Sequence, residues 1–338
     1  TGVSCMDVDI ADEKVLSLFN STDALNLDKD KLKIDLKVGT FGIPEFGTNF
    51  VQNMLIDTRP TSISELVRIS GLSHGTDVWV GNAKDLITSG VCTLSEAICC
   101  RDDIMLFLIN KGLDKKLAFT IMEAVRKGKG LTHEQEQAMR EKNVPDWYIQ
   151  SCKKIKYMFP KAHAVAYVIL SLRVAWFKVY YPVEYYSATF TLKVDDFDAT
   201  NMCHGADKAY SIYTTLKNAE NGNLSQKEED QKTVYELVLE MYARGIEFLP
   251  IDLYKSDATR FLPEGNAIRP PLCSLSGLGQ SAGESIVRAR DEGEFLSVED
   301  LKIRSGVNKN VIEVLRQEGC LDNLPETNQL SLFDFSCM

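Results

Sequence analysis

The longest run of nearly continuous hydrophobic character covers residues 162–180, A-H-A-V-A-Y-V-I-L-S-L-R-V-A-W-F-K-V-Y. It is apolar around most of a helical circumference, which predicts a core helix. The neighbouring segments place apolar residues at helical spacing on one face, so they predict amphipathic helices that supply the surface. We expect these helices at residues 95–112, 115–128, 132–142 and 145–157, and a further helix from Thr61 that ends at Gly71.

The remaining segments carry other patterns. Residues 39–48 are punctuated by Gly and Pro, which predicts a constrained turn. Residues 206–232 are polar and predict an exposed helical connector or linker, and a helix with short strand-like pieces follows up to Ile268. Residues 273–322 predict a compact helical segment. The expected fold class is therefore mainly α with some β (α+β).

Charge is distributed unevenly along the 338 residues. The net charge is −10, yet residues 101–180 contain 15 Lys and Arg against 8 Asp and Glu, which predicts a basic module inside an acidic body. No run of 18 apolar residues predicts a membrane span, and the N-terminus has no signal-peptide pattern. The nine cysteines lack paired spacings, which favours reduced thiols in a cytoplasm. The chain does not begin with Met, so we expect a piece of a longer protein.

The segment from Ser274 to Arg290 predicts a helix–hairpin–helix that binds the DNA backbone. A small apolar approach leads into Gly277, Leu278 and Gly279, and an amphipathic helix with Ser281 in its first turn follows. Glycines at this point let backbone N–H groups meet a phosphate without reading sequence. A degenerate second copy follows at residues 305–316. An ordinary glycine turn explains one copy alone, and two copies favour DNA binding.

Lysines alternate with aromatic residues in C-K-K-I-K-Y-M-F-P-K-A-H, residues 152–163. Positive charge suits phosphates and flat rings suit bases, so this segment is a candidate nucleotide site. A solvated lysine face over core aromatics is the alternative. A second basic cluster, R-K-G-K-G, occupies residues 126–130.

Other candidate chemistry is weaker. Residues 70–79, S-G-L-S-H-G-T-D-V-W, predict a dense polar loop and a tight turn. Cys92, Cys100 and Cys152, with His74 or Asp77 as a fourth ligand, are candidate zinc ligands, and buried structural thiols are the alternative. Asp7 and Asp9 predict an exposed acidic face. Asp102 and Asp103 predict an N-terminal helix cap. No carboxylate cluster for two-metal catalysis stands out.

An apolar peptide, Gln329-Leu330-Ser331-Leu332-Phe333, lies close to the end of the chain after a run with no helical or strand period, residues 322–327. Chain ends gain nothing from exposing such side chains. The peptide therefore either folds back onto the core or enters the groove of another protein.

These motifs, in this order, resemble the C-terminal portion of the bacterial replicative DNA polymerase III alpha subunit of PolC type. The resemblance rests on G-I-P-E-F-G-T (42–48), S-G-L-S-H-G-T-D-V-W (70–79), C-R-D-D-I-M (100–105), V-R-K-G-K-G (125–130), S-C-K-K-I-K-Y-M-F-P-K-A-H-A (151–164), G-E-F-L-S-V-E-D-L (293–301) and the terminal Q-L-S-L-F. It extends over nearly the whole chain.

The resemblance implies four parts: the end of the palm at 1–60, the fingers at 61–205, a connector and duplex-binding region with tandem helix–hairpin–helix at 206–325, and a flexible tail at 326–338 with a sliding-clamp (beta subunit) motif. The catalytic aspartates and their Mg²⁺ are expected upstream, so the fragment alone should be inactive. The implied partners are template-primer DNA, dNTP, the clamp and other replisome proteins, in the cytoplasm and without a membrane. The residues expected to bind nucleotide or template are Ser70, Ser73, His74, Arg101, Arg126, Lys127, Lys129, Lys153, Lys154, Tyr157, Phe159, Lys161 and His163.

Two hypotheses remain open from the sequence. The first is the fingers and duplex-binding part of a DNA-directed DNA polymerase. The second is a non-catalytic adaptor that binds DNA and the clamp. Palm aspartates upstream of Thr1 would favour the first. The family motif commonly stops at S-L-F, whereas five residues follow Phe333 in this chain.

Overall fold

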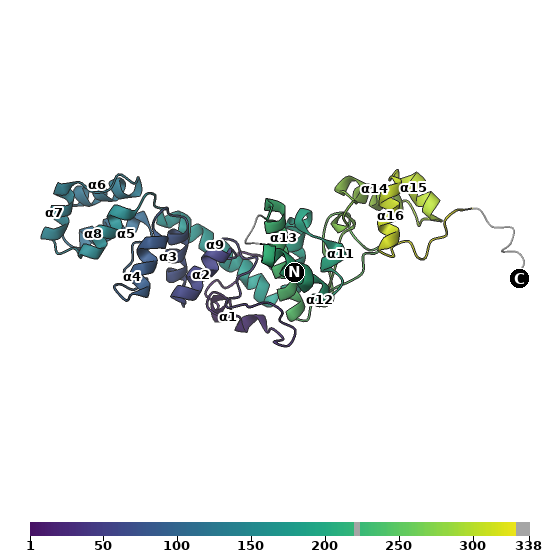
Figure 1. Ribbon diagram of the computed structural model, residues 1–338, viewed down its shortest axis with the longest axis horizontal. Coiled ribbons are helices and arrows are strands. Elements are labelled where there is room, and N and C mark those ends of the chain that lie inside the picture. Colours follow the sequence, from purple (N-terminus) through teal and green to yellow (C-terminus); the bar gives the residue numbers. More distant parts are fainter. Residues whose placement is uncertain (220–223, 329–338) are drawn as a thin grey trace, which may run out of the picture. The chain divides into compact units, whose positions relative to one another are not determined.

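The computed structural model describes residues 1–219 and 224–328 (Figure 1). The chain forms two compact units. The first unit comprises residues 2–25 and 36–179, and the second comprises residue 1, residues 26–35 and the chain from residue 180 onward. Helices dominate both units, and the described strands form one small sheet in the second, which confirms the predicted class of mainly α with some β.

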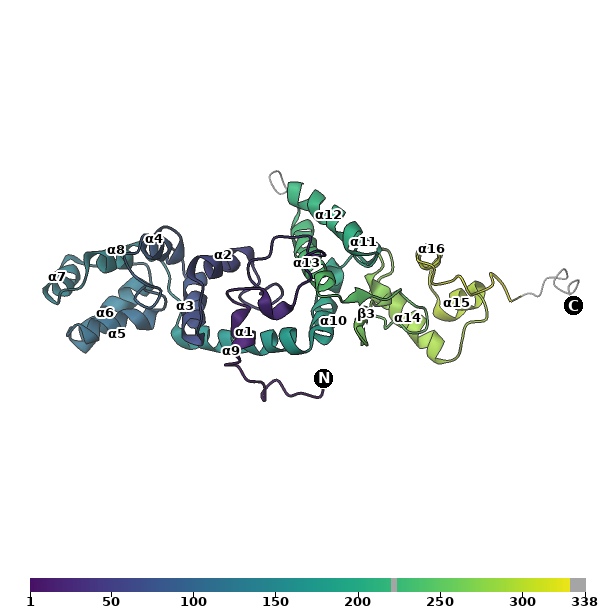
Figure 2. The ribbon, with the colours of Figure 1, turned by 90° about the horizontal axis from the view of Figure 1, so that it is seen from below.

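The first unit is built from short and medium helices around buried apolar side chains. Phe19 and Phe46, both fully buried, meet edge to face with ring centroids 5.0 Å apart. Helices α5 and α6 lie side by side in both ribbon views (Figures 1 and 2). The elements are α1 (Glu13–Ser17), η1 (Asp23–Leu25), α2 (Asn49–Thr58), α3 (Ile63–Ser73), a π-turn η2 (Trp79–Ala83), α4 (Lys84–Thr88), α5 (Arg101–Asn110), α6 (Lys115–Arg126), α7 (His133–Glu141), α8 (Asp146–Lys154) and α9 (Lys161–Tyr180).

Helix α3 does not end at Gly71 as the sequence predicted. It starts at a capping box between Ser62 and Glu65 and continues to Ser73. A Cβ atom at Gly71 would lie 2.7 Å from the carbonyl oxygen of Cys99. The glycine therefore serves close packing of α3 against the segment before α5, although glycine usually weakens a helix interior. Tertiary packing therefore accounts for the glycine inside α3, and helix propensity alone could not have predicted that the helix continues past it.

Helix α9 differs from the predicted core helix in one respect. Only one face of it is buried, formed by Ala164, Val168, Ser171, Leu172, Ala175 and Lys178, whereas Tyr167 and Leu170 are exposed. Its buried face is tied to the glycine-rich turn, because the hydroxyl of Ser171 donates to the carbonyl oxygen of Pro44 at 2.9 Å. By length and composition alone α9 could also cross a membrane, a test that core helices of folded domains pass as well.

The second unit contains α10 (Pro182–Leu192), η3 (Val194–Asp196), α11 (Ala199–Met202), α12 (Ala206–Ala219), α13 (Gln226–Ala243), β1 (Glu247–Phe248), β2 (Leu262–Glu264), β3 (Ala267–Arg269), η4 (Leu272–Ser274), α14 (Gln280–Asp291), α15 (Val298–Ser305) and α16 (Lys309–Gln317). The strand order is β1-β3-β2, with β1 parallel and β2 antiparallel to β3. Phe190, Phe197, Phe248 and Phe261 pack together beside this sheet.

The described residues of the predicted exposed helical connector at 206–232 are helical and mostly exposed, and they form part of a helix pair. Helices α12 and α13 pack against each other, and α13 begins at Gln226, ten residues before Glu236, where the sequence predicted a helix to begin. From Val234 to Ala243 every residue of α13 is buried, including Glu236 and Glu240. The carboxylate of Glu240 accepts a hydrogen bond from the hydroxyl of Tyr186 at 2.5 Å, which allows a charged residue to occupy the core.

Candidate nucleotide and DNA interfaces

Four aromatic rings from separate parts of the first unit lie together. The rings of His74 and Phe159 stack with centroids 4.7 Å apart, and Tyr167 lies 6.0 Å from Phe159 in a nearly parallel orientation. His163 meets Phe159 edge to face at 5.6 Å. The structure therefore brings the predicted residues His74, Phe159 and His163 together with Tyr167, and these four residues are called here the aromatic platform. Tyr167 was not predicted, although its place four residues after His163 on one helix could have revealed it.

Two sets of contacts hold the platform in place. Nε2 of His74 contacts the carboxylate of Glu45, a residue whose backbone adopts the left-handed region with φ of 67°. Thr76 exchanges backbone hydrogen bonds with the loop before α9, donating to the carbonyl oxygen of Tyr157 at 3.0 Å and accepting from Lys156 at 3.0 Å. The loop after α3 and the loop before α9 are thus joined as a short bridge, and Tyr157 remains 44% exposed beside it.

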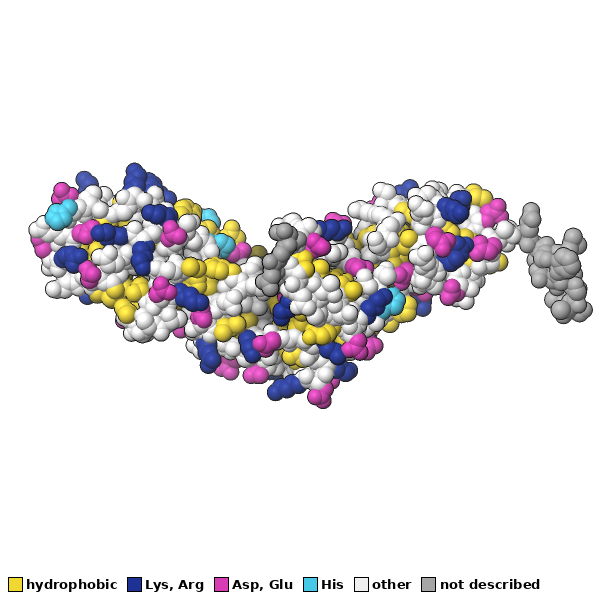
Figure 3. All heavy atoms as spheres, in the orientation of Figure 1, with side chains coloured by type: hydrophobic (Ala, Val, Ile, Leu, Met, Phe, Trp, Pro, Cys, Tyr) yellow, Lys and Arg dark blue, Asp and Glu magenta, His cyan; other side chains and the backbone are white. Residues whose placement is uncertain are grey.

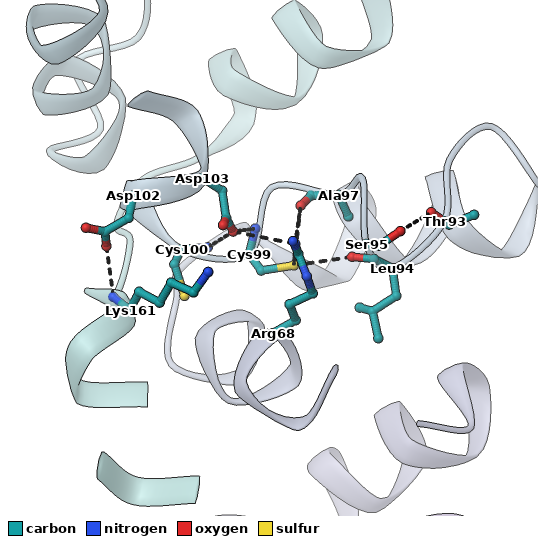
Figure 4. Close-up of polar contacts among 10 residues, drawn as sticks. All are labelled: Arg68, Thr93, Leu94, Ser95, Ala97, Cys99, Cys100, Asp102, Asp103 and Lys161. Atoms are coloured by element: carbon teal, nitrogen blue, oxygen red, sulfur yellow. Dashed lines mark hydrogen bonds and ion pairs between the residues drawn. The ribbon is translucent and has the colours of Figure 1, made fainter. Parts of the chain in front are cut away.

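The N-terminus of α5 positions the start of α9. The carboxylate of Asp102 accepts a hydrogen bond from the backbone N–H of Lys161 at 2.9 Å, as Figure 4 shows. The backbone N–H of Arg101 donates to the carbonyl oxygen of Phe159 at 3.3 Å. The contact with Asp102 uses the backbone of Lys161, and within the described parts of the chain its ammonium group has no hydrogen-bond or ion-pair partner.

Asp103 confirms the predicted capping role at the same helix. Its carboxylate accepts the backbone N–H groups of Cys99 at 3.1 Å and Cys100 at 2.9 Å (Figure 4). Arg68 of α3 lies 3.8 Å from the same carboxylate. Arg68, Tyr148 and Lys161 help to line a pocket of about 290 Å³ here. The sequence gave no signal for Arg68, because its neighbours Ala97 and Asp103 are far away in the chain.

Several of the predicted cations are already engaged within the protein. Arg126 and Lys127 both pair with Glu123, at 2.7 and 2.9 Å, and these bonds lower the pKa of Glu123 to about 2. Lys153 pairs with Glu136 at 2.8 Å. In Figure 3 the Lys and Arg side chains over α5–α8 are interspersed with Asp and Glu, so this face is not one continuous basic patch. The net charge of residues 101–180 therefore overstates the positive charge that is available to a bound phosphate.

The remaining predicted nucleotide residues occupy varied environments. The ammonium group of Lys154 donates to the carbonyl oxygen of Gly81 at 2.7 Å. Ser70 is buried with 1% exposure, and Ser73 donates to the carbonyl oxygen of Ser70 at 2.9 Å. Within residues 1–219 and 224–328, the ammonium group of Lys129 has no ion-pair or hydrogen-bond partner. Ser70 is therefore buried, unlike the exposed residues among those predicted to bind nucleotide or template.

The structure does not bring the predicted zinc ligands together. Among the described residues, no three His, Cys, Asp or Glu side chains are arranged to hold a metal ion. His74 is engaged with Glu45 and Phe159 instead. Burial raises the pKa of the Cys100 thiol to about 12, and it raises the pKa of Cys152 further, so both thiols stay protonated at neutral pH. The zinc prediction was wrong because spacing along the chain says little about distance in space.

The predicted DNA-binding hairpin lies between η4 and α14. Gly277 adopts φ of +92°, Leu278 is 1% exposed and anchors the turn, and Gly279 is the N-cap residue of α14. In the described part of the chain no side chain caps this helix, so the first backbone N–H groups of α14 stay open, with Ser281 exposed beside them. The second hairpin joins α15 to α16 through Gly306, and there the side chain of Asn308 does cap the helix.

The predicted clamp peptide, residues 329–333, lies outside the described residues, so its binding stays a prediction.

Comparison with known proteins defines the class to which these interfaces belong. Residues 1–145 match the family model of the bacterial DNA polymerase III alpha subunit finger domain, and residues 245–330 match a helix–hairpin–helix motif. The chain thus combines polymerase fingers with a helix–hairpin–helix region. Where the palm ends and the fingers begin stays a prediction.

Curated relatives specify the family. The chain is 54% identical over 335 residues to DNA polymerase III PolC-type of Caldanaerobacter subterraneus, 55% identical over 333 residues to that of Clostridium perfringens, and 53% identical over 333 residues to that of Bacillus subtilis. Each alignment covers 98% of this chain and 23 or 24% of the relative. The chain belongs to the PolC-type DNA polymerase III family and spans about a quarter of the length of these relatives.

Proposed function

We propose that this chain supplies the fingers and the duplex-binding region of a DNA-directed DNA polymerase, and that it binds the incoming dNTP, the template-primer and a sliding clamp. The observation that carries the proposal is the aromatic platform of His74, Phe159, His163 and Tyr167 beside Lys161. Flat rings suit a base and an unengaged ammonium group suits a phosphate. The free thiols of the described cysteines fit a cytoplasmic location.

In this proposal the chain positions the substrate. Mg²⁺ bound by carboxylates outside this chain would stabilise the charge that develops on the triphosphate. The residues described here would orient the nucleotide: the platform by stacking on the nascent base pair, and Lys161 by neutralising phosphate charge. Asp102 would act through Lys161, since it fixes the backbone from which the ammonium group projects.

Replacing Lys161 by Ala in the full-length polymerase should raise the KM for dNTP and lower kcat/KM by about 10- to 100-fold, because a charge-assisted phosphate contact is worth about 1.5–3 kcal/mol. Folding should be unaffected, since the contact with Asp102 uses the backbone of Lys161. Steady-state kinetics check this. Lys161→Arg, which keeps the charge, should recover part of the loss, and Lys115→Ala at the exposed start of α6 should match the wild type. Unchanged kinetics for Lys161→Ala would refute the role.

Replacing Gly279 by Val should weaken duplex binding by about tenfold, because the side chain would occupy the space through which a phosphate reaches the N-terminus of α14. A Cβ atom at Gly279 meets nothing within 4 Å, and its φ of −72° suits any residue, so folding should persist. Gly277→Val is a poorer test because φ there is +92°. Fluorescence anisotropy on duplexes over a salt series measures the effect, with Glu292→Val at the far end of α14 as control. Undiminished affinity would make the hairpin a packing turn.

A further inference from the structure

Pro325 and Glu326, close to the end of the described chain, are hydrogen-bonded to the N-terminus of α15, the first helix of the second hairpin. The backbone N–H of Val298 donates to the carbonyl oxygen of Pro325 at 2.9 Å, and that of Glu299 donates to the carbonyl oxygen of Glu326 at 3.1 Å. These are the first two N–H groups of α15, which have no acceptor within their own helix. We call Pro325 and Glu326 the strap. It completes the cap that Ser297 provides to the next N–H at 3.1 Å.

A second helix holds the strap from the side. The guanidinium group of Arg316 in α16 pairs with both carboxylate oxygens of Glu326, at 3.0 and 3.1 Å, and also contacts Glu313 at 2.9 Å. Both bonds to Glu326 come from Nη2 of Arg316, while Nη1 bonds Glu313, so one guanidinium group ties the strap to α16. The run at 322–327 has no helical or strand period, yet Pro325 and Glu326 within it are bound to α15 and α16.

This attachment limits how far the clamp peptide can travel. Gln329 is three residues beyond Glu326. Three extended residues span at most about 11 Å. Any protein that receives residues 329–333 must therefore come close to the N-terminal end of α15. This step rests on the proposed clamp binding.

An exposed apolar side chain is located at that end of α15. Leu296 is 69% exposed and precedes Val298 by two residues. Its backbone is held in place, because its N–H donates to the carboxylate of Asp300 at 3.0 Å and Arg304 donates to the carbonyl oxygens of Gly293 and Glu294 at 2.9 and 3.0 Å. A large apolar side chain on a fixed backbone suits a docking contact, since little conformational entropy is lost on binding.

We propose that Leu296 and the strap form a second docking surface for the ring-shaped clamp that binds the tail. The partner is a protein with one apolar groove for the Gln-Leu-Ser-Leu-Phe peptide and an adjoining surface that covers Leu296. The strap ensures that both contacts are made by the same partner. Peptide binding thereby becomes linked to a defined placement of the clamp beside the second hairpin.

The first test compares two equally exposed side chains of the same region. Leu296→Asp in the full chain should weaken clamp binding five- to tenfold, whereas Ile303→Asp, at a position 73% exposed on α15, should leave it unchanged. Surface plasmon resonance with purified clamp measures both. Equal affinities for Leu296→Asp and the wild type, or equal losses for both variants, would overturn the proposal.

The second test lengthens the chain between the strap and the clamp peptide, so that the bound clamp is no longer held close to α15. A photoreactive residue at Glu299 should cross-link to bound clamp, and inserting 20 Gly and Ser residues between Asn328 and Gln329 should abolish the cross-link while the peptide still binds. Absence of the cross-link without the insertion would refute the placement.

The third test releases the strap. Glu326→Arg should reduce the cross-link, and the exchanged pair Arg316→Glu with Glu326→Arg should restore it. A cross-link unaffected by Glu326→Arg would show that the strap does not determine where the clamp lies. If Leu332→Ala with Phe333→Ala leaves clamp binding intact, the proposed function fails; if that pair abolishes binding but the Leu296 and strap variants have no effect, only this inference fails.

Discussion

Changing both Leu332 and Phe333 to Ala is expected to abolish clamp binding and clamp-stimulated synthesis while activity on short primers persists. Burying a Leu or Phe side chain is worth roughly 1.5–3 kcal/mol. Losing both removes about 3–6 kcal/mol, a factor of about 10² to 10⁴ in affinity. Since a lone peptide of this length should bind with about micromolar affinity, the residual binding would be undetectable.

The proposed contacts with DNA phosphates explain why a clamp-binding tail would be useful. A polymerase that holds DNA through phosphates dissociates readily at physiological salt. A tether to a ring around the duplex converts each rebinding into an intramolecular step. Phe335→Ala provides the matched control, because it removes an aromatic ring two residues beyond the motif. Clamp binding that survives the double change would return the tail to the alternative of packing on its own core.

Replacing Lys178 by Met is expected to lower the free energy of unfolding of the first unit by about 2–4 kcal/mol. Lys178 is fully buried, and its ammonium group donates to the carbonyl oxygen of Gly39 at 2.9 Å and to that of Phe41 at 2.6 Å. Met preserves the length of the side chain but leaves both carbonyl groups without this donor. A buried polar group that loses its partner costs about 1–3 kcal/mol.

Tryptophan fluorescence during urea denaturation isolates this effect, because Trp79, Trp147 and Trp176 all belong to the first unit. Lys115→Met, at an exposed position of α6, controls for the change of residue type. A midpoint equal to that of the wild type would mean that water replaces the ammonium group at both carbonyl oxygens. Because the same turn carries Glu45, which contacts His74, the variant should also weaken nucleotide binding.

The strength of local patterns explains what could be predicted. The helical period located α6, α7, α8 and α9 to within a few residues, and the glycine pattern located the first hairpin. The pattern failed at α5, which begins at Arg101 although the apolar positions start earlier, because the segment before it forms a hydrogen-bonded turn between Thr93 and Glu96. Hydrophobic period reports burial, and it cannot distinguish a helix from a buried turn.

The sequence by itself determined the class of fold, the family, and which residues near 70–79 and 151–164 are chemically suited to a base and a phosphate. Only the tertiary structure decided which of those residues lie together. It placed Tyr167 with His74 and Phe159, engaged Arg126 and Lys127 with Glu123, separated the candidate zinc ligands, and tied Glu326 to Arg316. The physical reason is that residue type and period are local properties, whereas ion pairs, stacking and ligand geometry depend on distances between segments that only packing sets.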